Sequence, residues 1–393
     1  MNHSSATSAR IVSIDAFRAI TMLLMVFVND LWSVKGVPHW MQHAAFNEDM
    51  LGLSDVVFPA FLFVLGMSIP FALDGRLKKG ESKLRVLGHI LIRSVALLIM
   101  GLFSVNSGAG LSASVGISKP VFSLVMVTCF FVIWNNYPAT VSRSWKSIFK
   151  IMRIAAFCVL VFLAVIYRDA SGGVFRTRWW GILGLIGWTY LICAIIYLFA
   201  RKKLPVLIAA YICFILLCMG AANKQLGAFA GILPGNGCFH AFTMGGLLLS
   251  LAIHYYKGMN HTKRIFCAAI GGVVSILLGF LVNRWWIISK LQETPTWLFY
   301  CTGISVLCYL LLYWLTDLHK QVGWMKVIKP AGTSTLTCYL VPSILYAVFT
   351  LTGFHVTGFM AQGAMGLVKC AIFAFFTVFI TGVLEKIHIK LKL

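Results

Sequence analysis

The sequence is built from long apolar segments separated by short polar connections. These segments fall at about residues 15–33, 53–73, 85–105, 119–135, 148–167, 179–200, 204–222, 236–256, 264–286, 296–315, 329–350 and 364–385. Most are close to the roughly 20 apolar residues that a helix needs to cross the hydrocarbon core of a bilayer. Inside a membrane the backbone must satisfy its own hydrogen bonds, so such segments cross as helices. The pattern predicts an all-α polytopic membrane protein with about 12 transmembrane helices.

The composition excludes a soluble enzyme and a disordered chain. Of the 393 residues, 60% are hydrophobic and only 11% are charged, whereas soluble domains are about 25% charged. So few charges could not cover the surface of a soluble globule, and the chain is too apolar for disorder. No connection is long enough to fold by itself, so we expect residues 1–393 to form a single transmembrane domain.

The distribution of basic residues predicts the orientation. The chain has 33 Lys and Arg against 11 Asp and Glu, a net charge of +22. With the N-terminus inside, 23 of the 33 lie on the inner side and 9 on the outer side, and Arg93 lies within a segment. Cytoplasmic connections are enriched in Lys and Arg, so both termini are expected to be cytoplasmic. The sequence contains no basic arm and no basic–aromatic motif outside the membrane segments, so nucleic acid is not an expected partner.

The connection 31–54 is more polar than the others. It and its two flanking helix ends carry Asn29, Asp30, His39, Trp40, His43, Asn47, Glu48, Asp49 and Asp55. Ionisable side chains at membrane depth are costly and usually face a cavity or a functional site. We therefore place the candidate active site here, on the predicted outer side.

His43 is the best candidate for a catalytic residue in this connection. A neutral imidazole can accept a proton from a nucleophile and return it near pH 7. Asp55 or Asp30 could orient the ring by accepting its other N–H. The structural alternative is an interfacial histidine that is solvated between Trp40 and Phe46.

A metal site is a weaker interpretation of the same residues. His39 and His43 are four positions apart and could share a helical face, with Glu48 as a further ligand. Pro38 and the absence of an HExxH motif argue against that geometry, so no metal is expected.

Basic side chains inside the predicted helices suggest an anion site near the inner face. Arg18 could bind an anion or simply pair with Asp15, three residues earlier. Arg93 lies well inside its segment and must face protein or water; it would contact an anion or pair with Asp55 or Asp30.

Two further segments carry candidate binding residues. The sequence PAGTSTLTCYLVP at 330–342 places Thr333 and Ser334 at the start of a helix, where free N–H groups and hydroxyls suit a phosphate, with helix capping as the alternative. His240 follows a Pro234-Gly235-Asn236-Gly237 loop that could bring the backbone close to a ligand or could be only a turn.

With these residues in view, the sequence resembles a known family. The blocks SIDAFRAITMLLMVFVND and HAAFNEDMLGLSDVVFPAFLFVLGMSI, within 13–69, resemble the transmembrane acyltransferases of the heparan-alpha-glucosaminide N-acetyltransferase family. GNGCFHAFTMGGLLLSLA and KPAGTSTLTCYLVP are similar to its bacterial, DUF5009-type branch. The sequence departs from the pattern at Ala19, where the family has Gly, and at Gly184-Leu185, where the animal proteins have a Gln-Arg segment.

The resemblance implies an enzyme that takes acetyl from cytosolic acetyl-CoA, as co-substrate, and transfers it to an amino sugar or glycan on the periplasmic or lumenal side. His43 matches the family's essential histidine and would be the general base, Asn29 matches its helix-end asparagine, and Asp55 matches the Asp before Phe-Pro. Arg18, Arg85, Arg93, Thr333 and Ser334 are the expected acetyl-CoA contacts. Asp30, Trp40 and His240 are the expected acceptor contacts.

Several alternatives remain open at this point. Twelve helices with buried ionisable groups also suit a secondary transporter of a sugar or amino sugar, although we find no convincing internal repeat. A covalent acetyl-histidine intermediate, N- against O-acetylation, and a homodimer are equally undecided by the sequence. Membrane lipid is an expected partner in every case.

Overall fold

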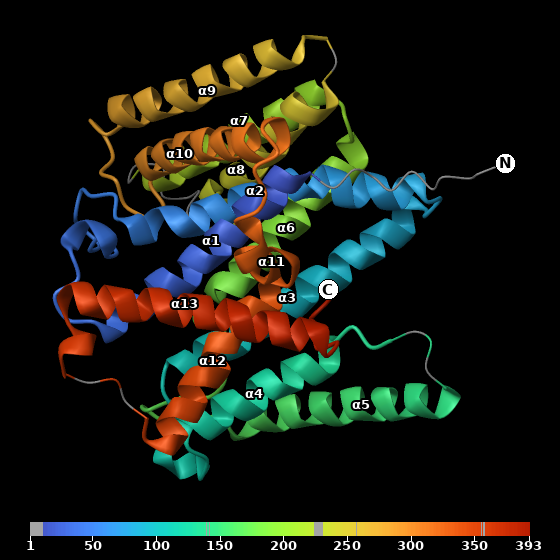
Figure 1. The fold of residues 1–393 in the computed structure, drawn as a ribbon, viewed down its shortest axis with the longest axis vertical. Helices are drawn as coiled ribbons and strands as arrows, with labels where there is room; N and C mark the ends of the chain where they lie inside the picture. Colours follow the sequence, from blue (N-terminus) through green and yellow to red (C-terminus); the bar gives the residue numbers. More distant parts are fainter. Residues whose placement is uncertain are drawn as a thin grey trace.

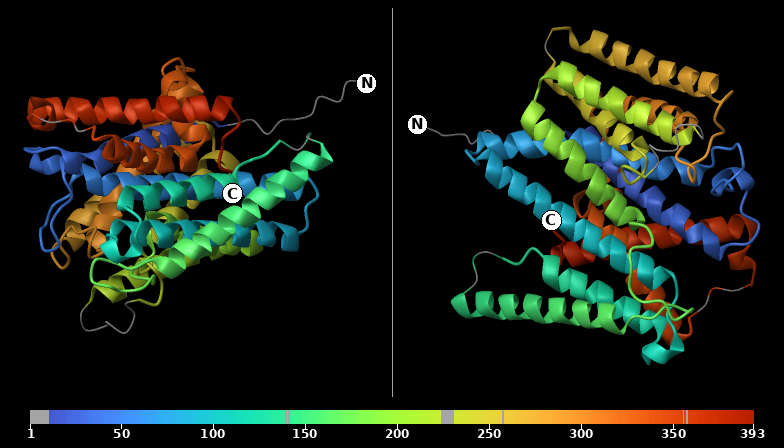
Figure 2. Two further views of the ribbon diagram at one scale, coloured as in Figure 1. Left: turned by 90° about the horizontal axis from the view of Figure 1, so that it is seen from below. Right: turned by 180° about the vertical axis from the view of Figure 1, so that it is seen from behind.

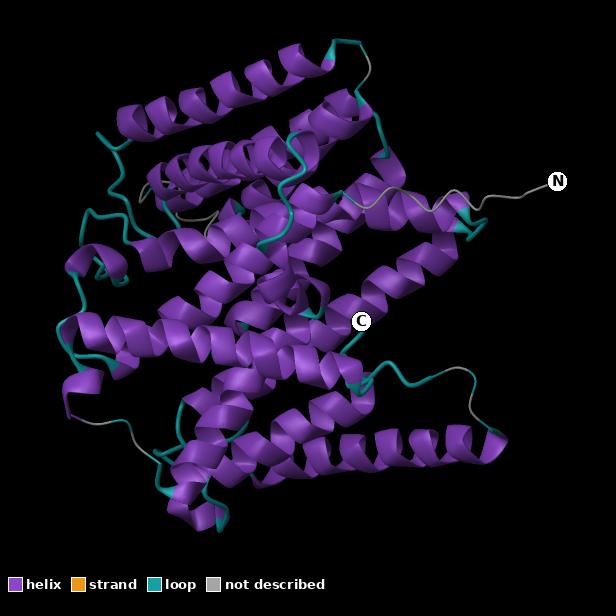
Figure 3. Cartoon of the chain, viewed as in Figure 1, coloured by secondary structure: helices purple, strands orange, loops and turns teal. Residues whose placement is uncertain are grey.

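The computed structural model describes residues 11–138, 140, 142–223, 231–256, 258–354, 356 and 358–393. Within these residues the chain folds into helices and connecting loops, with no β-strand (Figure 3). The all-helical prediction is confirmed.

The helices follow the apolar segments closely. In chain order they are α1 (Val12–Asp30), α2 (Leu53–Lys78), α3 (Lys83–Gly108), α4 (Lys119–Trp134), α5 (Arg143–Ile166), α6 (Gly181–Ala200), α7 (Leu204–Ala222), α8 (Cys238–Ser250), α9 (His261–Val282), α10 (Pro295–Tyr313), α11 (Met325–Thr333), α12 (Thr335–Thr352) and α13 (Gly363–Lys386). The first helix begins and the last helix ends on the same face of the bundle (Figure 1), as an even number of crossings requires. Which compartment that face meets stays a prediction.

Eleven of the described helices are long and apolar enough to cross a membrane. The remaining predicted segment, at 119–135, forms α4, a shorter apolar helix of 16 residues. Its length is about 24 Å at 1.5 Å per residue. The protein is thus an integral, multi-pass membrane protein.

The predicted helix at 329–350 is wrong in one respect, because it is broken. α11 ends at Thr333 and α12 begins at Thr335, with Ser334 between them in a non-helical conformation (φ −126°, ψ 48°). Hydropathy could not reveal the break, because it lies at the single residue Ser334, which does not end the apolar run.

The two N-terminal helices lie at the centre of the bundle, and α5, α7 and α9 lie at its edges (Figures 1 and 2). α2 crosses α8 at very close range. A Cβ on Gly66 would lie 1.8 Å from the carbonyl oxygen of Thr243, and a Cβ on Gly246 would lie 1.9 Å from that of Phe63. Small residues at such crossings let membrane helices pack backbone to backbone, so this crossing fixes α2, which carries candidate site residues at both of its ends.

Candidate active site

His43 and Asp55 form a hydrogen-bonded pair on the face where α1 ends and α2 begins. The Nδ1 atom of His43 lies 2.6 Å from Oδ1 of Asp55. Asp55 is only 2% exposed, whereas the His43 side chain is 49% exposed. In a neutral ring that donates its Nδ1–H to this carboxylate, the Nε2 atom carries the lone pair. Of the two carboxylates considered from the sequence, Asp55 is the partner.

Asp55 lies in the first turn of α2 and is held by hydrogen bonds from other segments. Its second oxygen, Oδ2, accepts the backbone N–H of Ala44 at 3.0 Å, and its carbonyl accepts the indole N–H of Trp297 at 3.0 Å. Next to it, the Ser54 hydroxyl donates to the Met41 carbonyl at 2.6 Å. The loop before α2 and the start of α10 therefore fix the carboxylate that orients the histidine ring.

Lys290 is the third ionisable residue of this site, and the sequence interpretation missed it. Its Nζ lies 3.8 Å from Oδ1 of Asp55 and 3.4 Å from Nδ1 of His43. Burial lowers the pKa of the Lys290 ammonium from its ordinary value, while the neighbouring Asp55 carboxylate opposes that shift. Lys290 lies 247 positions after His43, in a loop with no motif, so no local pattern could have pointed to it.

The loop 283–294 that carries Lys290 also anchors the loop 31–54. Asp49 accepts the backbone N–H of Ile288 at 2.7 Å and the Asn283 amide at 3.2 Å, and the Gln292 amide donates to the Phe46 carbonyl at 2.6 Å. Two loops from distant parts of the chain thus form one surface around His43.

The other predicted residues of this face have different surroundings. Asp30 is buried and accepts the Tyr346 hydroxyl at 2.8 Å, with Lys369 Nζ 3.4 Å away, so it belongs to a separate ionic cluster. Trp40 is exposed. His39 pairs with Glu48 at 2.9 Å while His43 pairs with Asp55, so the two histidines of the metal alternative engage different carboxylates.

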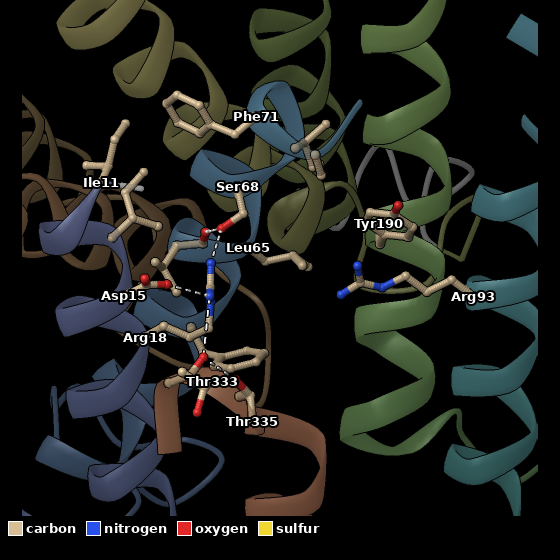
Figure 4. Close-up of a pocket in the computed structure, with 16 residues that line it drawn as sticks. Ile11, Asp15, Arg18, Leu65, Ser68, Phe71, Arg93, Tyr190, Thr333 and Thr335 are labelled. Carbon is tan, nitrogen blue, oxygen red and sulfur yellow. Dashed lines mark hydrogen bonds and ion pairs between the residues drawn. The ribbon is translucent and has the colours of Figure 1, made fainter. Parts of the chain in front are cut away.

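A cavity of about 610 Å³ opens at the far end of α1 and α2. Its lining includes the predicted residue Arg18, whose guanidinium donates to the Ser68 hydroxyl at 2.6 Å and to the Gly332 carbonyl at 3.4 Å. The predicted local pair with Asp15 is also present, at 3.1 Å. Figure 4 shows the Arg18 guanidinium between Ser68 and Thr333.

Arg93 lines the opposite wall of this cavity. Its guanidinium lies 4.5 Å from the centre of the Tyr190 ring, and Figure 4 shows it extending from its helix on the side of the cavity away from Arg18. Its Nε is buried without a hydrogen-bond partner among the described residues. The expected alternative of a pair with Asp55 or Asp30 is wrong, because those carboxylates have the partners given above; a contact to an anion remains.

A neighbouring cavity of about 460 Å³ shares part of this lining, including Phe61, Leu65, Arg93 and Thr335. It adds two further cations, Lys390 and Lys392, which the sequence interpretation did not single out. Both follow α13 in a short extended segment that pairs with residues 134–136.

Together the two cavities follow α1 and α2 toward the His43 face. On α1 their lining extends to Met25, and Asn29 is one turn further along the same helix face. On α2 it extends to Phe61, six residues or about 9 Å from Asp55. Asn29 is exposed. Its side chain forms no hydrogen bond to another described residue, and along the chain it lies between the cavity-lining residue Met25 and His43.

The four remaining predicted residues have different surroundings. Arg85 is exposed at the start of α3 and lines neither cavity. His240 is fully buried, with its ring 5.2 Å from that of Phe214. Thr333 lines both cavities, and Ser334 lines the second one at the α11–α12 break. The Thr333 hydroxyl donates to Glu385 at 2.9 Å. The roles of all these residues stay predictions.

The architecture and the site define an integral membrane protein with a histidine–carboxylate pair at one end of its central helices and a cationic cavity at the other. The chain belongs to a family described as Domain of unknown function (DUF5009), whose sequence profile it matches over residues 10–235. That range includes His43, Asp55, Arg18 and Arg93, and excludes Lys290.

Two curated proteins with an assigned activity are similar to part of the chain. A stretch of 103 residues is 42% identical to the heparan-alpha-glucosaminide N-acetyltransferase of Homo sapiens, and 102 residues are 37% identical to that of Mus musculus. Each match covers 26% of this chain and 15% of the relative. The chain is thus matched to only a small part of the length of these relatives.

Proposed function

We propose that the protein is a membrane-embedded acetyltransferase that uses acetyl-CoA from the cytoplasmic side and acetylates an amino sugar or glycan on the opposite side. The observation that carries this proposal is the His43–Asp55 pair, with Nδ1 bonded to a buried carboxylate at 2.6 Å and the His43 side chain half-exposed. The names of the similar proteins support the reaction class. The predicted orientation, with positively charged loops inside, supports cytoplasmic termini, and the resemblance to the bacterial branch of the family supports a bacterial inner membrane.

His43 acts as the general base on the acceptor amine in this proposal. As the amine nitrogen bonds to the acyl carbon, the carbon–sulfur bond breaks, and Nε2 takes the amine proton and passes it to the departing sulfur. Asp55 keeps the ring in the required tautomer and stabilises the imidazolium. Asn29, at the end of α1, is placed to donate a hydrogen bond to the carbonyl oxygen of the acyl group.

The cavity cations suit the anionic phosphates of coenzyme A. Arg18 and Arg93 face the cavity from two walls, Lys390 and Lys392 line its neighbour, and the Arg93 Nε has no partner among the described residues. Acetyl-CoA supplies the acetyl group as an activated thioester. Ser68, which receives a hydrogen bond from Arg18, is 13 residues from Asp55 on α2, which is about 20 Å along the helix. An extended donor arm would have to bridge that distance between phosphates and His43.

The first test measures binding of acetyl-CoA to the purified protein in detergent, by calorimetry and by thermal unfolding. Selective micromolar binding of acetyl-CoA and CoA, and not of ATP, is expected, and Arg18→Gln with Arg93→Gln should abolish it. A folded sample that binds none of these ligands would contradict the proposal. Uptake of amino sugar into vesicles without acetyl-CoA would then favour the transporter alternative.

A further inference from the structure

A second concave region lies at the edge of the bundle formed by α7, α8, α9 and α10, away from the site described above. It encloses about 700 Å³. All four helices contribute to its mainly apolar walls, for example through Tyr211, Leu248, Val274 and Val306. Figures 1 and 2 show α7 and α9 at the edge of the molecule, where few of their side chains are buried. The groove is therefore open to the hydrocarbon region.

Two cationic side chains line one end of this groove. Lys202 precedes α7, and its Nζ lies 4.3 Å from the Tyr255 ring centre and 3.6 Å from a carboxylate oxygen of Asp74. Arg264, in the first turn of α9, forms no ion pair in the part of the chain that the structure describes. Its side chain donates from one terminal nitrogen to the carbonyls of Ile253 and Tyr256, at 2.7 and 2.6 Å, and leaves a buried Nε unbonded. Asp74 is a single carboxylate that lies within 4.0 Å of both Arg201 and Lys202. With Arg264, three cations surround one carboxylate, so this end is positive.

The dimensions of the groove match an acyl chain. Along α9 its lining runs from Arg264 to Leu278, which is 14 residues or about 21 Å. One leaflet contributes half of a hydrocarbon core of roughly 30 Å. A chain that starts beside the cations can therefore extend along the whole depth of its own leaflet within the groove.

We propose that this groove is a specific site for one anionic phospholipid. Its phosphate contacts Lys202 and Arg264, and one acyl chain lies along α9. Basic pockets between transmembrane helices are suited to anionic head groups, which enrich the cytoplasmic leaflet. The opposite end of α9 leads into the loop 283–294 that contacts His43, so the lipid phosphate lies on the face away from the histidine. The bound lipid is thus a structural component of the folded protein and not the acetyl acceptor.

Gly271 offers a way to close the groove. It lines the groove from α9, and a Cβ added there would meet no atom within 4 Å. Gly271→Phe would therefore place its Cβ in open space and direct its ring toward the space assigned to the acyl chain. Gly88→Phe is the matched control, because Gly88 in α3 also faces open space and does not line the groove.

The test uses the full chain, delipidated in detergent, with phosphatidylglycerol or phosphatidylcholine of identical acyl chains added back. We expect phosphatidylglycerol to raise Tm by several degrees more than phosphatidylcholine and to stay bound as one copy in native mass spectrometry. Gly271→Phe should lose both effects, Gly88→Phe should keep them, and Lys202→Gln should lose the preference for phosphatidylglycerol. Equal Tm shifts for the two lipids in the wild type would overturn the proposal. So would a Gly271→Phe variant that keeps the bound lipid. If Gly271→Phe does not fold, an unchanged lipid preference in Lys202→Gln overturns it alone.

Discussion

The two ends of the α1–α2 pair differ in almost every physical respect. At the His43 end, one buried carboxylate, one half-exposed imidazole and one ammonium lie within 4 Å of each other, fixed by hydrogen bonds from two loops. At the Arg18 end, side chains from several helices line wide cavities of about 610 and 460 Å³ with their cations spread apart. Proton transfer needs the first kind of geometry, and a large polyanionic ligand needs the second. The difference supports our proposal that chemistry and donor binding are divided between the two ends.

The strongest way to break this division is to remove the base. We expect His43→Ala to lower the acetyl-transfer rate by about 10²- to 10⁴-fold, as loss of a general base does, while acetyl-CoA still binds at the other end. His39→Ala is the control, because His39 lies in the same loop and pairs with Glu48. Rates of acetylated product formation and calorimetric acetyl-CoA affinity, measured on both variants, separate the two effects. Comparable rates for His43→Ala and the wild type would refute the assignment.

Asp55→Asn tests whether orientation of the ring matters as much as its presence. The amide cannot supply the charge that holds Nδ1–H, so a loss of about 10²-fold or more in kcat is expected, with little change in the KM for acetyl-CoA. Asp169→Asn is a suitable control, since Asp169 is also buried but pairs with Arg178 instead. A fall in thermal stability without a fall in kcat would make Asp55 only structural.

Arg93→Gln sharpens the comparison from the other end. A charge-assisted hydrogen bond contributes about 1.5–3 kcal/mol, so the KM for acetyl-CoA should rise about tenfold or more with kcat nearly unchanged. Arg85→Gln should have a much smaller effect, because Arg85 lines neither cavity. Steady-state kinetics on the two variants decide between them, and a larger KM effect from Arg85 would point to a donor site outside the cavities.

We expect Glu293 to make a smaller contribution to stability, and one that depends on pH. Burial raises the pKa of this carboxyl to about 7, partly opposed by the Asn236 amide, which donates to it at 2.7 Å. The unfolded state releases this proton near the ordinary carboxyl pKa of 4.5, whereas the folded state retains it to higher pH. Stability therefore falls as pH rises from about 4.5 through 7. Glu293→Gln cannot lose this proton, and its Tm should fall less over that range. Parallel Tm–pH curves for the two proteins would contradict the pKa shift.

The sequence predicted the helices well because membrane spans follow from local hydropathy alone. It also placed His43, Asp55 and Asn29 together at one end, because they lie within 27 positions of one another in a polar connection. Only the structure could decide whether Asp55 or Asp30 is the partner of His43. Asp30 instead accepts a hydrogen bond from Tyr346 and pairs with Lys369. Lys290, Lys390 and Lys392 were missed because they are brought in by the packing of distant helices, which no periodic pattern encodes.

The most direct test of the account measures sided transfer in proteoliposomes. Acetyl-CoA is supplied only on the side of the Arg18 cavity and glucosamine only on the side of His43, with His43→Ala vesicles in parallel. The account predicts N-acetylglucosamine on the glucosamine side in wild-type vesicles and none in the variant. Equal product from both kinds of vesicle, or none from wild-type vesicles that bind acetyl-CoA, would contradict it.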